Sequence, residues 1–346
     1  MVYVALFTNS KSGKNKLDLK RYGESRRINR LKRIIGDNGE VHVTGKAKDY
    51  MGDLEGKVID ACKHNPDAVA IDGGDGTLST VMSMVSKHWK GDELPFIAIV
   101  KGGTFEVLAN RLHIDDSFKY LENIVRTQYA DDFTVEGINM MSVKDDSKNE
   151  HLCFSAGTGF PVLLLEEQYK KKHLKYLRAG LVILRMLGSA IIDGSYYKRF
   201  DKHERMIVSG RGHTSNIMEE EDWLSVMAQS IESISVPKIL PQPKLFRKAE
   251  TGNRFHGIGV SIPLRKLLQY APAIYEGDSV FYRDDNTSKT RPVLEIDRQL
   301  KDMLIQSEEP FRYQFNGELS YNHKPCETRE LEITSGRVFS FIKDDF

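Results

Sequence analysis

Residues 71–82 read IDGGDGTLSTVM, a stretch in which three glycines and an aspartate interrupt an apolar run before a new periodic pattern begins. The preceding residues 68–71, AVAI, are all apolar, as expected of a parallel strand covered on both faces. After Thr77, apolar residues recur at the spacing of a helix. The glycines are therefore predicted to form a turn from a strand into a helix.

Such a turn is a place where open α/β sheets bind ligands. The carboxyl ends of parallel strands line the ligand crevice, and unpaired N–H groups at the start of the next helix suit a phosphate. Glycine lets the backbone approach that anion and adopt a positive φ where one is needed. Asp75 is unexpected here, because its carboxylate would repel a phosphate unless a metal ion or a proton transfer uses it. The alternative is a tight turn in which Asp75 caps the helix.

The composition is that of a folded globular protein. The chain has 346 residues, enough for two domains, with 40% hydrophobic and 29% charged residues. Its net charge of +1 provides no general attraction for nucleic acid. The three cysteines match no metal or disulfide spacing, which favours a reducing, cytoplasmic location. The N-terminus lacks the features of a secretory signal, and no stretch has the length and apolarity of a transmembrane helix.

The first 130 residues alternate between strand and helix patterns, which predicts an α/β domain with a mostly parallel sheet. Three of its strands run into similar loops: TNSKSGKN after the first, DGGDGT after the third and KGGTFEVLANRL after the fourth. Each loop combines glycine with hydroxyl or amide side chains and leads toward a helix. Because such loops converge at one edge of a sheet, together they predict a polyphosphate site.

From about residue 131 the pattern changes to short runs rich in Val, Ile, Phe and Tyr, separated by polar turns. We interpret residues 131–326 as a mainly antiparallel β-sandwich domain and expect residues 327–346 to rejoin the first domain. A long helical pattern interrupts the strands, and its residues 168–187, QYKKKHLKYLRAGLVILRML, have the pattern of a basic amphipathic helix. Such a helix either binds an anionic membrane surface or packs on the sandwich with its lysines in solvent.

The ordered set of motifs resembles the lipid kinase family that includes bacterial diacylglycerol kinases and the sphingosine and ceramide kinases. NSKSGKN stands where that family has an Asn-Pro-x-Ser-Gly loop, GGDGT is its signature, and GGTFEVLANRLHI matches its Gly-Thr-x-Asn helix start. Further on, FSAGTGF resembles its Gly-x-Gly-Phe segment, YAPAIYEGDSVFY its late strand and FNGE its Asp-Gly-Glu. The resemblance spans nearly the full length of the chain.

The resemblance implies an ATP-binding α/β domain, a β-sandwich domain and a lipid hydroxyl that is phosphorylated in the cleft between them, with Mg²⁺ neutralising the phosphates. By position, the nucleotide contacts of the family fall on eight residues: Asn9, Ser12, Gly13, Gly74, Gly76, Thr77, Gly103 and Thr104. Backbone N–H groups and hydroxyls that cradle phosphates account for these residue types. Lys14 is either a further phosphate contact or a solvated lysine. No motif names the lipid, and the oligomeric state stays open.

Three positions depart from the family pattern. Ser10 replaces the proline of the first loop, and Pro161 stands where an Asp usually follows Gly-x-Gly-Phe. Asn316 replaces the Asp of Asp-Gly-Glu, although a kinase that acts on an alcohol needs a carboxylate to accept the hydroxyl proton. Asp75 and Glu318 are the remaining candidates, and Glu318 would share a face with Asn316 if the segment is a strand. FNGE is alternatively a simple hairpin turn.

The leading hypothesis is therefore an ATP-dependent lipid kinase, cytoplasmic and peripherally attached to the membrane that holds its lipid substrate. A NAD kinase shares GGDGT, but the later motifs of that family are not found. A pseudokinase that binds nucleotide or lipid without turnover is the alternative that Asn316 and Pro161 favour. None of these readings includes a nucleic-acid partner.

Overall fold

The computed structural model of the chain separates into two compact units, the first made of residues 1–138 and 338–346 and the second of residues 139–337. The first unit is thus built from both ends of the chain. The residues that the structure describes are 1–12, 15, 26–45, 49–102, 107–169, 182, 185–186, 189, 194, 196–212, 216–231, 253–269, 294–316 and 326–344.

The first unit is built on a six-stranded sheet with the order β2-β1-β3-β4-β16-β5. Strands β2, β1, β3, β4 and β16 are parallel, each to its neighbour. The strands are β1 (Val4–Asn9), β2 (Gly39–Thr44), β3 (Ala68–Gly73), β4 (Phe96–Lys101), β5 (Val135–Asn139) and β16 (Val338–Ile342). All six residues of β3 are buried, so the apolar run before GGDGT is a central strand, as expected of a sheet covered on both faces.

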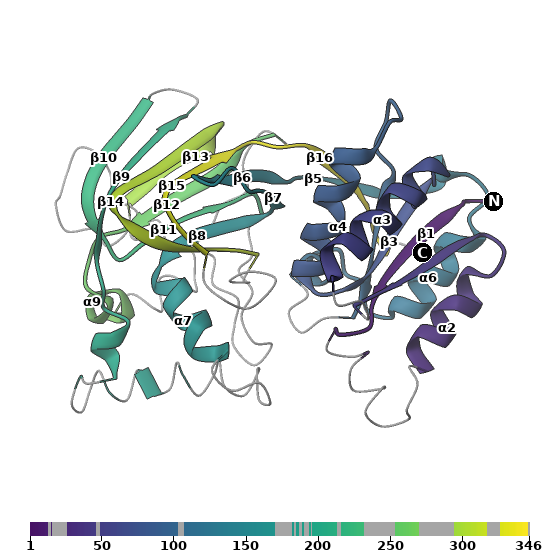
Figure 1. Cartoon of the computed structure of the whole chain (residues 1–346), viewed down its shortest axis with the longest axis horizontal. Helices are drawn as coiled ribbons and strands as arrows, with labels where there is room; N and C mark the ends of the chain where they lie inside the picture. Colours follow the sequence, from purple (N-terminus) through teal and green to yellow (C-terminus); the bar gives the residue numbers. More distant parts are fainter. Residues whose placement is uncertain are drawn as a thin grey trace. The chain divides into compact units, whose positions relative to one another are not determined.

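Helices cover this sheet on both sides (Figure 1). α3 (Tyr50–Lys63) packs beside α4 (Asp75–His88), and α2 (Arg26–Ile35) packs beside α6 (Ser117–Arg126). The buried residues of α2 are Ile28, Leu31 and Ile35, at the spacing of one helix face. The unit also contains the short helices α5 (Val107–Arg111) and η1 (Ala130–Asp132).

The strand order contains a switch point between β1 and β3. From β1 the chain passes to β2 on one side, whereas from β3 it passes to β4 on the other. In open α/β sheets the connections on either side of such a point diverge and leave a crevice outside the carboxyl ends of the strands. The turns after β1 and β3 flank this position.

The second unit contains a ten-stranded antiparallel sheet whose main path is β13-β12-β11-β8-β14-β15-β6-β7, with β9 pairing β14 and β10 pairing β9 (Figure 1). The strands are β6 (Met141–Asp145), β7 (Glu150–Cys153), β8 (Ser155–Gly159), β9 (Glu204–Arg211), β10 (Asn216–Trp223), β11 (Ser225–Gln229), β12 (Phe255–Val260), β13 (Leu294–Leu300), β14 (Asp302–Phe315) and β15 (Cys326–Thr334). The antiparallel domain expected from the sequence is confirmed, but its strands belong to one hydrogen-bonded sheet. The long β14 makes this possible, since its first part pairs β9 and its last part pairs β8.

Two apolar clusters stabilise the second unit. The larger gathers side chains from most strands, including the fully buried Trp223, Phe255 and Phe315. The smaller lies near α7 (Phe160–Tyr169), η2 (Tyr197–Arg199) and α9 (Leu264–Gln269), and includes Val182 and Met186. These two residues belong to the basic amphipathic segment 168–187, so this part of the segment packs within the unit.

The boundaries of the units differ from those expected at residues 130/131 and 326/327. β5 adds to the parallel sheet, which extends the first unit to residue 138. β15 pairs β14 and β6, so residues 327–337 belong to the second unit and the chain returns to the first only at Val338. The sequence pattern changes near residue 131, but strand pairing sets both boundaries.

Candidate functional site

The carboxyl ends of β1, β3 and β4 lie side by side at one edge of the parallel sheet. The register pairs Thr8 with Asp72, and it pairs Gly73 with Lys101. The three loops that the sequence assigned to a polyphosphate therefore start from neighbouring positions. They do so beside the switch point of the sheet, where ligands of such folds bind.

Asn9 connects two of these loops. Its Nδ2 donates a hydrogen bond to Oγ1 of Thr77 at 3.0 Å, and its Oδ1 accepts one from the backbone N–H of Lys11 at 2.9 Å. Gly45 lies against the same amide with φ at +88°, so a side chain there would be strained and would crowd Asn9. Asn9 thus shapes the loop after β1 and holds it against the first turn of α4.

The two serines of the loop after β1 differ in their contacts. Ser10 Oγ donates to the carbonyl of Thr44 at 2.7 Å, which fastens the loop to the end of β2. Ser12 is buried, and its Oγ has no hydrogen-bond partner among the described residues. Because a buried hydroxyl without a partner is unfavourable, a ligand or water is expected to complete its hydrogen bonding.

The GGDGT turn leads directly from β3 into α4. Gly74 is the N-cap, with φ −96° and ψ −178° and no side-chain cap bond, and the helix begins at Asp75. Asp75 is therefore not the cap that the alternative interpretation required. None of Gly73, Gly74 and Gly76 has a positive φ. Gly73 is instead needed for space, because an added Cβ would lie 2.5 Å from Cβ of Thr77.

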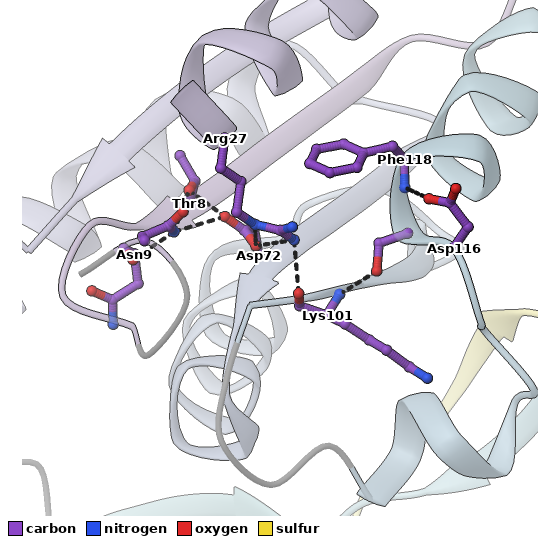
Figure 2. Close-up of polar contacts among 9 residues, drawn as sticks. Thr8, Asn9, Arg27, Asp72, Lys101, Asp116 and Phe118 are labelled. Carbon is purple, nitrogen blue, oxygen red and sulfur yellow. Dashed lines mark hydrogen bonds and ion pairs between the residues drawn. The ribbon is translucent and has the colours of Figure 1, made fainter. Parts of the chain in front are cut away.

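A second aspartate, Asp72, is the centre of the polar contacts at this edge (Figure 2). It is the next-to-last residue of β3 and is fully buried. Its Oδ2 accepts hydrogen bonds from Thr8 Oγ1 at 2.6 Å and from Asn15 Nδ2 at 2.9 Å, and its Oδ1 accepts from Arg27 Nη2 at 2.9 Å. We call Thr8, Asn15, Arg27 and Asp72 the Asp72 network.

Arg27 extends this network to the third loop. Its Nη2 also donates to the carbonyl of Lys101, the last residue of β4, at 2.7 Å (Figure 2). Its guanidinium carbon lies 4.8 Å from the ring centre of Phe118, at the start of α6. Its side chain is only 11% exposed, and removing one partner of such a buried pair typically costs about 3–5 kcal/mol. The pair therefore joins α2 to the ends of β3 and β4.

Lys101 and Gly102 complete the described part of the third loop. The backbone N–H of Lys101 donates to Ser117 Oγ at 2.9 Å, and its Nζ donates to Oδ1 of Asn110 at 3.2 Å. A methyl group on Gly102 would collide with Oδ1 of Asp72. The start of the loop is thus packed directly onto the buried carboxylate.

Sequence reasoning did not identify Asp72, Arg27 or Lys101. The signal for Asp72 was present, because a charged residue within a strand that is buried on both faces is rare unless it is paired. Arg27 could not be matched to it, since α2 shows only a basic helix and nothing in the sequence marks which arginine turns inward. The sequence pattern around Lys101 indicates only the end of a strand.

Asn316 in the second unit follows the last residue of β14, in the left-handed region at φ +52°. Its Oδ1 accepts hydrogen bonds from the backbone N–H groups of Phe154 at 2.9 Å and Ser155 at 3.1 Å. Its Nδ2 is buried and has no partner among the described residues. β14 ends at Phe315, so Asn316 is not part of this strand, and Glu318 lies outside the described residues.

Several predicted residues lie outside the described part of the chain: Gly13, Lys14, Gly103, Thr104 and Glu318. Of the predicted nucleotide contacts, the structure brings together Asn9, Ser12, Gly74, Gly76 and Thr77 at the ends of β1 and β3. Within the described residues, no group of three or more His, Cys, Asp or Glu side chains is placed to hold a metal ion. Nor is any described helix long and apolar enough to cross a membrane.

Comparison with known proteins agrees with this arrangement. Residues 3–134 match the family model of the diacylglycerol kinase catalytic domain. The fold is similar to that of two solved structures from Bacillus anthracis str. Sterne that are assigned as diacylglycerol kinases. One has a TM-score of 0.61 at 16% identity and the other 0.57 at 15% identity, and in both cases the match covers 99% of this chain and 97% of the other. No curated protein matches the chain by sequence.

Proposed function

We propose that the protein transfers the γ-phosphoryl group of ATP to a hydroxyl group of a lipid, because residues 3–134 match the family model of the diacylglycerol kinase catalytic domain. The acceptor is diacylglycerol-like or sphingoid- or ceramide-like. The proposal extends to a peripheral contact with the membrane that contains this lipid.

The observation that carries the proposal is the junction of three loops at the switch point of the parallel sheet. Asn9 ties the loop after β1 to Thr77 at the start of α4, and Arg27 ties Asp72 to the end of β4. Backbone N–H groups in the first turn of a helix suit phosphate oxygens, and the buried hydroxyl of Ser12 could donate to them as well. We assign Gly13, Gly74, Gly76, Gly103 and Thr104 to the same nucleotide site.

The chemistry requires one proton acceptor. The acceptor hydroxyl loses its proton to a carboxylate as its oxygen bonds to the γ-phosphorus, and ADP leaves with the electrons of the broken P–O bond. Asp75, buried at the first turn of α4, is our first candidate, and Glu318 is the second. The amide of Asn316 cannot take up the proton at neutral pH, so its contribution would be a hydrogen bond from Nδ2.

Mg²⁺ fits a site of this kind. The ion is usually held by one or two carboxylates together with substrate phosphates, so it needs no preformed cage. If Asp75 holds the ion, Glu318 is left as the proton acceptor. When bound, the ion would neutralise charge on the phosphates. The protein's own part is to position the nucleotide and to accept the proton.

The first test is direct transfer. Purified protein with γ-labelled ATP is supplied with mixed micelles of diacylglycerol, sphingosine or ceramide and, in parallel, with NAD⁺, and the labelled product is identified. We expect label in one lipid. Label in NAD⁺ alone would overturn the proposal, and nucleotide binding without any label would favour the pseudokinase alternative that Asn316 and Pro161 suggest.

The second test places the nucleotide. Gly74→Asp adds bulk and negative charge at the N-cap of α4 and should abolish ATP binding, measured by calorimetry. Gly56→Asp is the matched control, because Gly56 is exposed on α3 and an added Cβ there meets nothing within 4 Å. Equal ATP affinity in both variants would remove the nucleotide from this turn.

A further inference from the structure

We propose that Arg27 is a positioning residue of the nucleotide site, which neutralises the buried carboxylate of Asp72 so that the three loops can accept a polyphosphate. The inference rests on the proposed function, because it concerns how the site tolerates the charge of ATP. Arg27 acts through Asp72 and through the end of β4.

The position of Asp72 creates the electrostatic problem. Its carboxylate is fully buried at the carboxyl end of β3, directly before GGDGT, and it lies against Gly102 at the start of the third loop. A negative charge at this point faces the edge where a polyphosphate would bind. It is also shielded poorly, since buried charges are screened much less than those in solvent.

The carboxylate is retained because it organises the loops. It accepts hydrogen bonds from Thr8 on β1 and from Asn15 beyond β1, and Asn15 Nδ2 also donates to the carbonyl of Asn9 at 2.9 Å. An apolar residue at position 72 would remove the acceptor of the buried Thr8 hydroxyl and one of the hydrogen bonds of Asn15.

Arg27 supplies the compensating charge at contact distance. Nε and Nη2 of Arg27 both donate to Oδ1 of Asp72, at 3.1 and 2.9 Å. The two hydrogen bonds fix the orientation of the guanidinium, and the Arg27–Asp72 pair has no net charge. The bond from Nη2 to the Lys101 carbonyl anchors the third loop to the same group. Arg27 therefore combines neutralisation with placement of the loop.

Arg30 provides a matched control on the same helix. Its guanidinium lies over the same Phe118 ring, 4.0 Å from the centre, and pairs with Glu122 at 3.8 Å. Its side chain is 51% exposed, and it is three residues from Arg27. Arg30→Met thus removes an equivalent ring contact and an equal charge from α2 while leaving Asp72 paired.

The test compares ATP with adenosine, which has no phosphate, for Arg27→Met, Asp72→Asn, the double variant and Arg30→Met. We expect Arg27→Met to weaken ATP binding by at least about tenfold, equivalent to about 1.4 kcal/mol, and adenosine binding by much less. The ATP affinity of Asp72→Asn should lie within about threefold of the wild-type value or exceed it, because the unpaired positive charge of Arg27 would attract the phosphates. The double variant should recover to within about threefold of the wild type, since no buried charge remains.

Each outcome bears on the proposal. Recovery of ATP affinity in the double variant supports neutralisation. Wild-type ATP affinity in Arg27→Met, or equal losses for ATP and adenosine, would overturn it. Circular dichroism shows whether Arg27→Met folds. If it does not, Asp72→Asn and the double variant decide the question. Tenfold weaker ATP binding in both of these variants, with normal thermal unfolding, would reject the neutralisation of Asp72 by Arg27. A wild-type protein that binds no ATP would instead reject the proposed function itself.

Discussion

The side-chain oxygen of Asn316 accepts a hydrogen bond from the backbone N–H of Phe154 at 2.9 Å, and this contact holds the end of β14 against the junction of β7 and β8. Ser155 donates to the same oxygen at 3.1 Å. An aspartate at this position could keep both contacts with one carboxylate oxygen and place the other where Nδ2 now lies. Exchange of asparagine and aspartate at this position would therefore preserve the structural contact and alter only the second atom of the side chain.

We therefore expect Asn316→Asp to fold normally and to raise lipid kinase turnover. The two N–H groups would favour the ionised form of the carboxylate, and its second oxygen would be a proton acceptor. General-base catalysis of this kind typically raises the reaction rate by about 10²- to 10⁴-fold. Steady-state turnover with the accepted lipid measures the effect. Asn316→Ala separates the structural part, since it removes the acceptor of the buried Phe154 N–H and should lower stability by about 1–3 kcal/mol. Unchanged turnover in Asn316→Asp would place the proton acceptor elsewhere.

The hydrogen bond from Asn9 to Thr77 yields a second prediction. Thr77→Val keeps the shape of the side chain but removes the acceptor at 3.0 Å, so the loop after β1 loses its tie to α4. ATP affinity should fall about three- to tenfold, in line with a net hydrogen-bond value of about 0.5–1.5 kcal/mol. Ser83→Ala is the control, because that hydroxyl donates a hydrogen bond within α4, to the carbonyl of Ser79 at 2.8 Å. A loss of equal size in both variants would indicate a general effect on the helix.

The sequence predicted the parts of the fold that have a local periodic signal. The parallel strands of the first unit followed from apolar runs such as residues 68–71, and the turn into α4 followed from GGDGT. β5 belongs to the first unit and β15 to the second because each pairs with strands that are distant in the sequence. No local sequence pattern contains this information.

For the candidate site, the sequence predicted the residues that lie within motifs but not the partners that other segments supply. Residues within a motif, such as Asn9 and Thr77, are brought together as the convergence of parallel strands requires. The partners of Asp72 come from three separate segments, and only the packing of α2 against α6 turns Arg27 rather than Arg30 inward. Such a pairing is a property of the tertiary structure, and an isolated helix pattern does not contain it.

His151 predicts how the second unit responds to acid. Burial lowers the pKa of this imidazole below its ordinary value, while the charges of Asp145 and Glu150 oppose the shift. The imidazole stacks on the ring of Phe315, with 4.5 Å between the ring centres. Because the folded state disfavours the charged form, the unfolded state binds more protons below its pKa of about 6.5. The contribution of His151 to the free energy of unfolding should therefore be constant above that pH. It should fall as the pH drops through the pKa that His151 has in the folded state.

Chemical denaturation of the wild type and His151→Phe between pH 7.5 and about 5 tests this response, since the ordinary histidine pKa is near 6.5. Phenylalanine can retain the stack on Phe315 and cannot titrate, so the variant should lose less stability on acidification. The largest slope that one group can cause is about 1.4 kcal/mol per pH unit. His64→Phe, at an exposed histidine of the first unit, is the control for the substitution itself. Parallel pH curves for wild type and His151→Phe would exclude this residue as the cause.

The last prediction concerns the contact with the membrane. The basic amphipathic segment 168–187 contains Lys170, Lys171, Lys172 and Lys175, which lie outside the described residues. Farther along it, Val182 and Met186 are buried in the smaller apolar cluster, and Arg185 lies over the ring of Tyr196 at 4.2 Å. This end of the segment is therefore anchored within the second unit, so a membrane contact would be made by the lysine-rich part that precedes it.

We expect replacement of the four lysines by glutamate to release the protein from anionic vesicles, because each cation near such a surface contributes about 1 kcal/mol. Co-sedimentation with vesicles of phosphatidylserine and phosphatidylcholine measures release, and activity on vesicular lipid should fall with it while ATP affinity stays unchanged. A matched quadruple variant in the first unit, with exposed Lys32, Arg33, Lys63 and Lys87 changed to glutamate, has the same change in net charge and should still sediment. If the segment variant sediments like the wild type, its lysines are solvated and the lipid surface is met by another part of the chain. If both variants are released equally, the attraction depends on net charge alone and the segment has no special role in it.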